Sequence, residues 1–375
     1  MSDARPIRVL HLTDHLNLGG VQTFLLNLIA AWQDDRFVLE VAALHGPGKH
    51  HGAFVSAGIA PVYAKHSKYD PALPFRLARL LRQSSPDIIH ASGVPACLLV
   101  ERLRGVCPGA KLITHLQSSY RQHDSQPYQN LLEAFCHRRS DHVIACSHAV
   151  LEGFHRRAPV SVIPNGIATL NISEAEAAAA RSRQRGAAGF GLGDLVIGSV
   201  GRLVSGKDPL TLARAFAAVK KTIPNARLLW VGDGPLRGSF LAELDKQGLE
   251  GDCHITGFVP STEVGGWLRA MDVFAFPSLR EGMPLSLIES MHAGMPCIAA
   301  DFPAASEVIS HGKNGILVPR QEADALAAAI AALAQDESKR ATLGAAARAT
   351  VEERFTSKRM VEQIADVYRG LVSVS

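Results

Sequence analysis

The chain has 375 residues, of which 47% are hydrophobic, and this length predicts two domains rather than one. Its six cysteines are scattered without metal-ligand spacing, which predicts a reduced, cytoplasmic protein. No apolar run approaches the about 18 residues of a membrane span, and a 6% aromatic content without a mixed basic and aromatic tract argues against nucleic acid as a partner.

The net charge of +4 is unevenly distributed along the chain. Residues 1–190 contain 20 Lys and Arg against 14 Asp and Glu, a balance of +6, so the remainder carries 19 against 21, a balance of −2. This asymmetry predicts an anionic partner for the first half, either a phosphate-bearing acceptor or a phospholipid surface. In the second case the protein would bind peripherally at the inner face of the cell membrane. Ordinary scatter of surface charge is the alternative.

Strand-like and helix-like segments alternate from the N-terminus onward, which is typical of parallel α/β domains. In the first half the predicted strands are 7–12, 37–43, 87–90, 111–115, 142–146 and 160–163. Gly19 and Gly20 close the loop after the first strand, where glycines let the backbone approach a ligand closely. His115 ends a strand, and a neutral imidazole there can orient a sugar hydroxyl. The alternatives are a plain tight turn and a structural histidine.

An Ala- and Arg-rich segment, 174–185, and a Gly-rich segment, 186–193, predict a connector between domains. The strands predicted beyond it are 195–200, 226–231, 252–256, 273–277, 297–300 and 315–318. The expected fold is therefore α/β, with two Rossmann-like doubly wound domains that face each other across a cleft. The expected domains are 1–170, 171–355, and a C-terminal helix over 356–375 that packs back on the first domain.

The loop after the first strand of the second half carries two cations. It reads Gly201-Arg202-Leu-Val-Ser-Gly-Lys207 and precedes a helix, which is the position of a phosphate-binding loop. It has neither the Walker form nor a G-x-G-x-x-G pattern. Arg202 can bind a diphosphate as a fork and Lys207 as a point charge, and solvated surface cations are the alternative.

Two carboxylates with seven residues between them follow the apolar strand 273–277. Glu281 lies before a predicted helix that has Pro284 at its first position, and Glu289 lies inside that helix. With about 3.6 residues per turn, both side chains can point into one cleft. This pattern predicts a site for a sugar nucleotide, and a surface helix with two solvated acids is the alternative.

Together these residues resemble the retaining GT-B glycosyltransferases of family 4, the glycosyl transferases group 1, over nearly the whole chain. The motifs that carry the resemblance are Gly19-Gly20, Pro164-Asn165-Gly166, Gly201-Arg202 with Lys207, Gly257-Phe258-Val259, and the stretch from Glu281 to Glu289. One departure is Ala304 and Ala305, where the family commonly has glycines.

The resemblance implies that domain 1–170 binds the acceptor and domain 171–355 binds the nucleotide-sugar donor. It also implies specific roles for the matched residues. Arg202 and Lys207 would neutralise the departing diphosphate, while Glu281 and His115 would lie beside the donor sugar. Glu289 would accept hydrogen bonds from the ribose hydroxyls. The other residues that would bind the donor are Gly19, Gly20, Phe258, Val259, Gly282, Met283, Pro284 and Leu285.

The resemblance also implies the reaction. A hexose-type sugar would pass from a nucleotide diphosphate sugar to a glycan or lipid-linked glycan, with retention of configuration and without a metal or other cofactor. An epimerase or phosphorylase of the same fold, or a binding subunit without activity, are the alternatives.

Overall fold

The computed structural model describes residues 5–17, 19–65, 70–118, 139–152, 158–169 and 173–373. The chain divides into two compact units. Unit 1 extends to Ala168 and includes the segment from Thr356 to the C-terminus, and unit 2 is Thr169–Phe355. The sequence placed these boundaries after residues 170 and 355.

Unit 1 is built on a parallel sheet of seven strands in the order β3-β2-β1-β4-β5-β6-β7. The strands are β1 Ile7–His15, β2 Phe37–His45, β3 Val62–Lys65, β4 Ile88–Ser92, β5 Lys111–Leu116, β6 His142–Ala145 and β7 Val160–Val162. The helices are α1 Gly20–Ala31, α2 His51–Ser56, α3 Leu73–Ser84, α4 Val94–Arg102 and α14 Ser357–Ser373. The sequence analysis did not predict β3, an edge strand whose first residue, Val62, is 54% exposed, so that it has no continuous apolar run.

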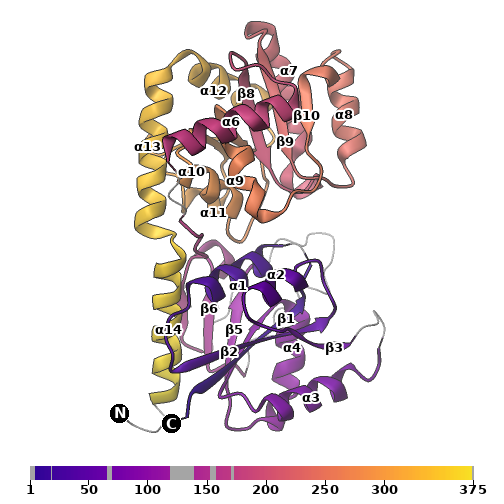
Figure 1. The fold of residues 1–375 in the computed structure, drawn as a ribbon, viewed down its shortest axis with the longest axis vertical. Coiled ribbons are helices and arrows are strands. Elements are labelled where there is room, and N and C mark those ends of the chain that lie inside the picture. The colour runs from indigo at the N-terminus through magenta and orange to yellow at the C-terminus, as the bar shows by residue number, and fades with distance from the viewer. Residues whose placement is uncertain are drawn as a thin grey trace. The chain divides into compact units, whose positions relative to one another are not determined.

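Hydrophobic cores lie on both faces of the unit 1 sheet, because successive strand side chains point to opposite faces. Val9 packs in one core with Phe24 of α1 and Ile364 of α14, whereas Leu10 and Leu12 pack in the other. The last helix α14 therefore completes unit 1 beside α1, although α1 lies more than 300 residues earlier in the chain (Figure 1).

Unit 2 contains a second parallel sheet, of six strands in the order β10-β9-β8-β11-β12-β13. The strands are β8 Leu195–Val200, β9 Ala226–Val231, β10 Cys253–Ile255, β11 Val273–Phe276, β12 Cys297–Ala300 and β13 Ile316–Val318. The helices are α6 Glu174–Ala188, α7 Pro209–Thr222, α8 Arg237–Asp245, α9 Ser261–Arg269, α10 Leu285–His292, α11 Pro303–Ser306, α12 Ala323–Gln335 and α13 Glu337–Arg354. The strand order reverses between β8 and β11, and ligands of doubly wound sheets bind at such a switch point, beyond the carboxyl ends of the strands.

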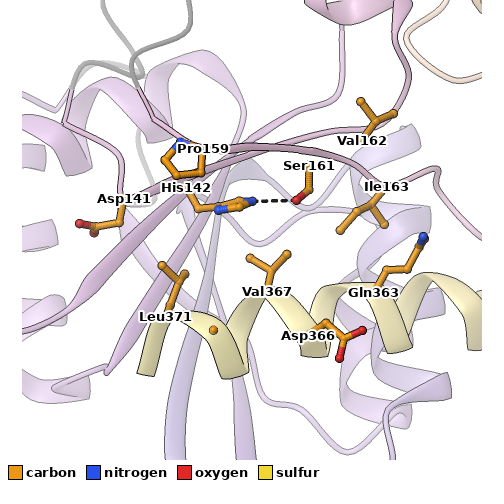
Figure 2. Close-up of a pocket in the computed structure, with 11 residues that line it drawn as sticks. Asp141, His142, Pro159, Ser161, Val162, Ile163, Gln363, Asp366, Val367 and Leu371 are labelled. Atoms are coloured by element: carbon orange, nitrogen blue, oxygen red, sulfur yellow. Dashed lines mark hydrogen bonds between the residues drawn. The ribbon is translucent and has the colours of Figure 1, made fainter. Parts of the chain in front are cut away.

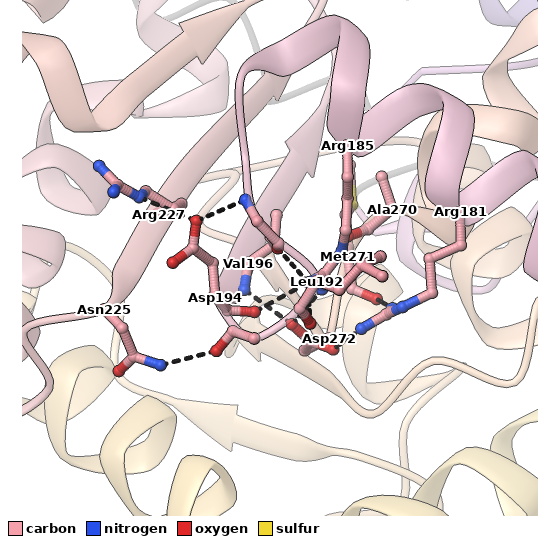
Figure 3. Close-up of polar contacts among 12 residues, drawn as sticks. Arg181, Arg185, Leu192, Asp194, Val196, Asn225, Arg227, Ala270, Met271 and Asp272 are labelled. Atoms are coloured by element: carbon pink, nitrogen blue, oxygen red, sulfur yellow. Dashed lines mark hydrogen bonds and ion pairs between the residues drawn. The ribbon is translucent and has the colours of Figure 1, made fainter.

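The connector expected over 174–193 is wrong, because its first part is the helix α6, packed on α9 within unit 2. Ser173 and Glu176 form a capping box at its start, and Gly189 ends it in the left-handed region at φ 74°. The Arg185 side chain is fully buried, where it donates to four backbone carbonyls and to Asp272 (Figure 3). These contacts attach α6 to the sheet of unit 2.

No helix in the described ranges is long and apolar enough to cross a membrane.

Candidate functional site

The loop after β8 lies at the switch point of unit 2. Gly201 has φ 152°, and a Cβ at this position would lie 3.2 Å from Cε of Lys207, so glycine leaves room for the lysine to fold over the loop. The Leu279 N–H, in the loop after β11, donates to the Gly206 carbonyl at 2.9 Å. The two loops on either side of the switch point are therefore joined.

Lys207 forms an ion pair with Glu281, and each side chain is 21% exposed. The Lys207 ammonium also lies 5.0 Å from the centre of the Phe276 ring, a cation–π arrangement. Glu289, on α10, is partly buried, and this burial raises its pKa to about 7, although the charge of Lys207 acts to lower it. Lys207 thus pairs with Glu281 and acts electrostatically on Glu289. These three residues are the Lys207 cluster.

The segment between the two carboxylates is largely buried. Helix α10 begins at Leu285, with Pro284 as its N-cap, so the proline stands one position before the place predicted for it. Gly282, Met283 and Pro284 are buried, and the Leu285 N–H donates to the Met283 carbonyl at 3.0 Å. The start of α10 therefore turns tightly beside the Lys207 cluster.

Arg202 lies on the same loop as Lys207, but its side chain is exposed. It makes no side-chain hydrogen bond or ion pair within the part of the chain that the structure describes. Its guanidinium is therefore not bound to the Lys207 cluster.

Neighbouring loops at this edge are held close together by glycines. A Cβ at Gly234 would lie 2.4 Å from the Leu203 carbonyl oxygen, so only glycine fits where the loop after β9 crosses the loop after β8.

Beyond β10, Phe258 is 56% exposed and Val259 is partly exposed. An exposed aromatic ring follows β10 at the same carboxyl edge of the sheet.

The predicted residues of unit 1 are in two different environments. Gly19 and Gly20 are exposed at the N-terminus of α1. His115 is only 1% exposed, and its burial lowers its pKa to about 3, so the ring is neutral. Its contact with a sugar stays a prediction.

Sequence reasoning missed the partners of His115. His115 Nδ1 lies 3.0 Å from His90 Nε2, and His115 Nε2 lies 3.0 Å from Gln117 Nε2. His90 Nδ1 in turn lies 2.6 Å from the Tyr368 hydroxyl on α14. His90 ends a predicted strand beside that of His115, but no pattern indicates a tyrosine 278 residues away.

A separate groove of about 670 Å³ lies in unit 1 between β6, β7 and α14 (Figure 2). His142 and Ser161 line one side and are joined by a hydrogen bond of 2.9 Å, while Gln363 and Val367 line the other. None of the predicted site residues lines this groove.

Within the ranges described above, no group of three or more His, Cys, Asp and Glu side chains is arranged to hold a metal ion.

Comparison with solved structures defines the fold. The structure of the Anabaena protein HepE in complex with UDP and glucose matches with a TM-score of 0.84 at 23% identity, over 97% of this chain and 100% of that chain. This chain therefore has the GT-B fold of glycosyltransferases.

Two family models match consecutive parts of the sequence. The model "Glycosyltransferase Family 4" matches residues 18–169, and "Glycosyl transferases group 1" matches residues 180–350. The chain belongs to the family 4 glycosyltransferases.

Two curated relatives show how far the similarity extends. A GDP-mannose-dependent alpha-(1-6)-phosphatidylinositol monomannoside mannosyltransferase of Mycobacterium tuberculosis is 30% identical over 231 residues, 58% of this chain and 57% of that protein. The match thus covers less than two thirds of the mannosyltransferase. The lipopolysaccharide core biosynthesis glycosyltransferase LpsD of Rhizobium meliloti is 28% identical over 94% of this chain and 96% of that protein.

Proposed function

We propose that this protein is a glycosyltransferase that moves a hexose-type sugar from a nucleotide diphosphate sugar to a glycan or lipid-linked glycan acceptor. The observation that carries the proposal is the cluster of Lys207, Glu281 and Glu289 at the switch point of unit 2. The named activities of the relatives support it, since one is a mannosyltransferase and another acts in lipopolysaccharide core biosynthesis.

The proposed chemistry assigns charge stabilisation to the two cations of the β8 loop. As the bond between sugar and diphosphate breaks, negative charge develops on the leaving diphosphate. Lys207 is held on this loop by its ion pair, and Arg202 is exposed beside it, so both can neutralise that charge. In this proposal the cations replace a metal ion, and the transfer retains the anomeric configuration.

The carboxylates bind the two ends of the donor in this proposal. Glu281, paired with Lys207, contacts the sugar, and Glu289 accepts hydrogen bonds from the ribose hydroxyls. Phe258 and Val259, beyond β10, contact the base, and the backbone of 282–285 contacts the sugar and the phosphates. Gly19, Gly20 and His115 keep the donor-binding roles that the resemblance implies.

The proposed transfer is tested by following nucleoside diphosphate and phosphate in the presence and absence of acceptors. A thermal-shift screen with nucleotide sugars first selects the donor, because a bound ligand stabilises the folded protein. We expect nucleoside diphosphate to be released only when an acceptor is added. Three results would contradict transfer. Release of nucleoside diphosphate without an acceptor is the first, and cleavage of the donor that depends on phosphate, as in a phosphorylase, is the second. The third is donor binding with no turnover across a broad acceptor panel, as in a binding subunit.

We also propose that unit 1 contacts an anionic membrane surface through the outer face of α3, at the cytoplasmic side of the membrane. Helix α3 buries Leu77 and Leu81, while Phe75 is 79% exposed and Arg79 and Arg82 are exposed at helical spacing from it. The helix contains no acidic residue. An exposed aromatic ring beside two arginines that make no ion pair with any described residue suits a surface of anionic lipid headgroups.

Sedimentation with vesicles that contain anionic lipids tests this surface. Each arginine near such a membrane contributes about 1 kcal/mol, so Arg79→Gln with Arg82→Gln should weaken binding about 30-fold. The matched control, Lys358→Gln with Arg359→Gln, removes the same charge from exposed positions of α14. Equal vesicle binding by the α3 and α14 variants would refute the α3 surface.

A further inference from the structure

Unit 1 has a switch point of its own, between β1 and β4. Its strand order reverses there, and ligands of doubly wound sheets bind beyond the carboxyl ends of the strands at such a point. Asp14 lies at the carboxyl end of β1, next to Thr13, which pairs with Ser92 at the end of β4. The proposed donor-binding roles do not include Asp14.

One oxygen of the Asp14 carboxyl is fixed by the helix that follows β4. Helix α4 has Gly93 as its N-cap, without a side-chain cap, and Pro95 in its first turn has no N–H. Asp14 supplies the cap from β1, because its Oδ1 accepts a hydrogen bond from the Ala96 N–H at 2.9 Å. This bond sets the orientation of the carboxyl group.

The other oxygen, Oδ2, makes no hydrogen bond or ion pair with any described residue. Gly93 has φ 96°, and a Cβ there would lie 2.4 Å from Oδ2, so glycine leaves the space that this oxygen occupies. The Asp14 residue as a whole is partly buried. The carboxyl group therefore presents one acceptor atom that is fixed and one that is open.

No described cation compensates the charge of Asp14. The first turn of α4, residues 94–97, contains no basic side chain, and His15 is exposed and accepts at Nδ1 from the Asn17 N–H at 3.3 Å. Burial without a cation raises the pKa of Asp14 from 3.8 to about 6. Such a carboxylate opposes folding, and groups of this kind cluster at functional sites.

Asp14 lies on the opposite face of the sheet from His115. Asp14 follows Leu12 by two residues, and Leu12 belongs to the core that includes Ala96 of α4. His115 follows Ile113 by two residues, and Ile113 belongs to the core that includes Phe24 of α1. Because strand side chains alternate between faces, Asp14 is on the α4 side, away from His115 and α1.

We propose that Asp14 binds the acceptor, through a hydrogen bond from a hydroxyl of the acceptor glycan to Oδ2. This inference rests on the proposed function, in which the nucleotide sugar occupies the switch point of unit 2. The acceptor is then the substrate left for the switch point of unit 1. An ionised carboxylate can only accept hydrogen bonds, so its ligand must donate, as the hydroxyls of a glycan do.

Asp14→Asn tests this contact without removing the cap of α4. The amide oxygen of asparagine can still accept from the Ala96 N–H, while an amide nitrogen, which only donates, replaces Oδ2. The probes are octyl glucoside, galactoside and mannoside, offered with saturating nucleotide sugar at pH 8. We expect kcat/KM for the octyl glycoside that accepts sugar to fall between about 12-fold and about 150-fold, the equivalent of one hydrogen bond to a charged group, mainly through its KM.

Two controls accompany this measurement. Asp35→Asn removes the same charge from an exposed position of unit 1 and should leave the KM of the octyl glycoside unchanged. The affinity of Asp14→Asn for the nucleotide sugar, from thermal shift, should equal that of the wild type. An unchanged octyl glycoside KM in Asp14→Asn, or an equal rise in Asp35→Asn, would overturn the proposal.

The dependence on pH separates binding from a purely structural role. The folded-state pKa of Asp14 is the higher one, so its stabilising contribution is complete below pH 3.8 and is lost above pH 6. Asp14→Asn cannot ionise, and its midpoint of unfolding in urea at pH 8 should therefore exceed that of the wild type. A variant with weaker acceptor binding and a lower midpoint would overturn the proposal, because Asp14 would then only cap α4.

The octyl glycoside KM of the wild type should also rise as the pH falls below 6, where Asp14 takes up a proton, whereas that of Asp14→Asn should not. Titration of Glu289 is common to both proteins, so their difference isolates Asp14. Equal pH profiles would overturn the proposal. A wild-type protein that binds nucleotide sugar but transfers it to no acceptor would instead contradict the proposed function, and this inference with it.

Discussion

Replacement of Glu289 by glutamine tests the electrostatics of the candidate site directly. Burial raises the pKa of Glu289 from 4.5 to about 7. At about 1.4 kcal/mol per pH unit, ionisation of this carboxyl then destabilises the folded protein by at most about 3.5 kcal/mol. Because the folded-state pKa is the higher one, the stabilising contribution is complete below pH 4.5, falls as the pH rises, and is lost above pH 7.

Glu289→Gln keeps the shape of the side chain but cannot ionise. The stability of the variant relative to the wild type should therefore rise by roughly 2 to 3 kcal/mol between pH 5 and pH 8. Urea unfolding at each pH, followed by the fluorescence of Trp230 and Trp267 in unit 2, measures the difference. Glu353→Gln, at an exposed position of α13, controls for the loss of one carboxyl. Parallel curves for Glu289→Gln and the wild type would refute the reasoning.

Two further predictions concern the construction of unit 2 and are measured by chemical unfolding. Arg185→Met should destabilise the protein by about 3 kcal/mol, because it removes a fully buried guanidinium that donates to four backbone carbonyls and to Asp272. Asp272 keeps Arg181 and the Val196 N–H as donors, which limits the loss. Arg183→Met, the control, changes an exposed side chain of the same helix. A small effect of the first variant would contradict the role of α6. Gly234→Ala should destabilise by more than about 1 kcal/mol because its Cβ meets the Leu203 carbonyl, and Gly238→Ala, with open space around it, should be neutral or stabilising. Equal stability of the two alanine variants would contradict the close approach of the loops.

Most strands were predictable because a parallel strand buried on both faces is a nearly continuous apolar run. Val273–Phe276, with all four residues buried, shows this pattern clearly. β3 did not show it, because this edge strand is only partly covered, with Val62 54% exposed and Tyr63 partly exposed. The helix α6 was mistaken for a connector because its stability depends on Asp272 and on the Ala270 carbonyl, more than 80 residues from Arg185.

The candidate site was predictable where motifs follow strands, and not where the fold joins distant residues. Lys207 and Glu281 each follow a strand, so both were assigned to the carboxyl edge of the sheet. Their ion pair depends on the adjacency of β8 and β11, which the sequence does not show. Equally, the raised pKa of Glu289 arises from burial by surrounding residues, and the contact of Tyr368 with His90 arises from the return of the last helix to unit 1.

The most direct test of the proposed function is the transfer rate of Lys207→Ala and Arg202→Ala, measured as acceptor-dependent release of nucleoside diphosphate. Removal of one group that stabilises developing charge lowers kcat by about 100-fold to 1,000-fold, and we expect losses of this size in both variants with normal folding. Lys246→Ala, at an exposed lysine of unit 2, is the control. Rates near the wild type in both folded variants would contradict the claim that these cations stabilise the leaving diphosphate.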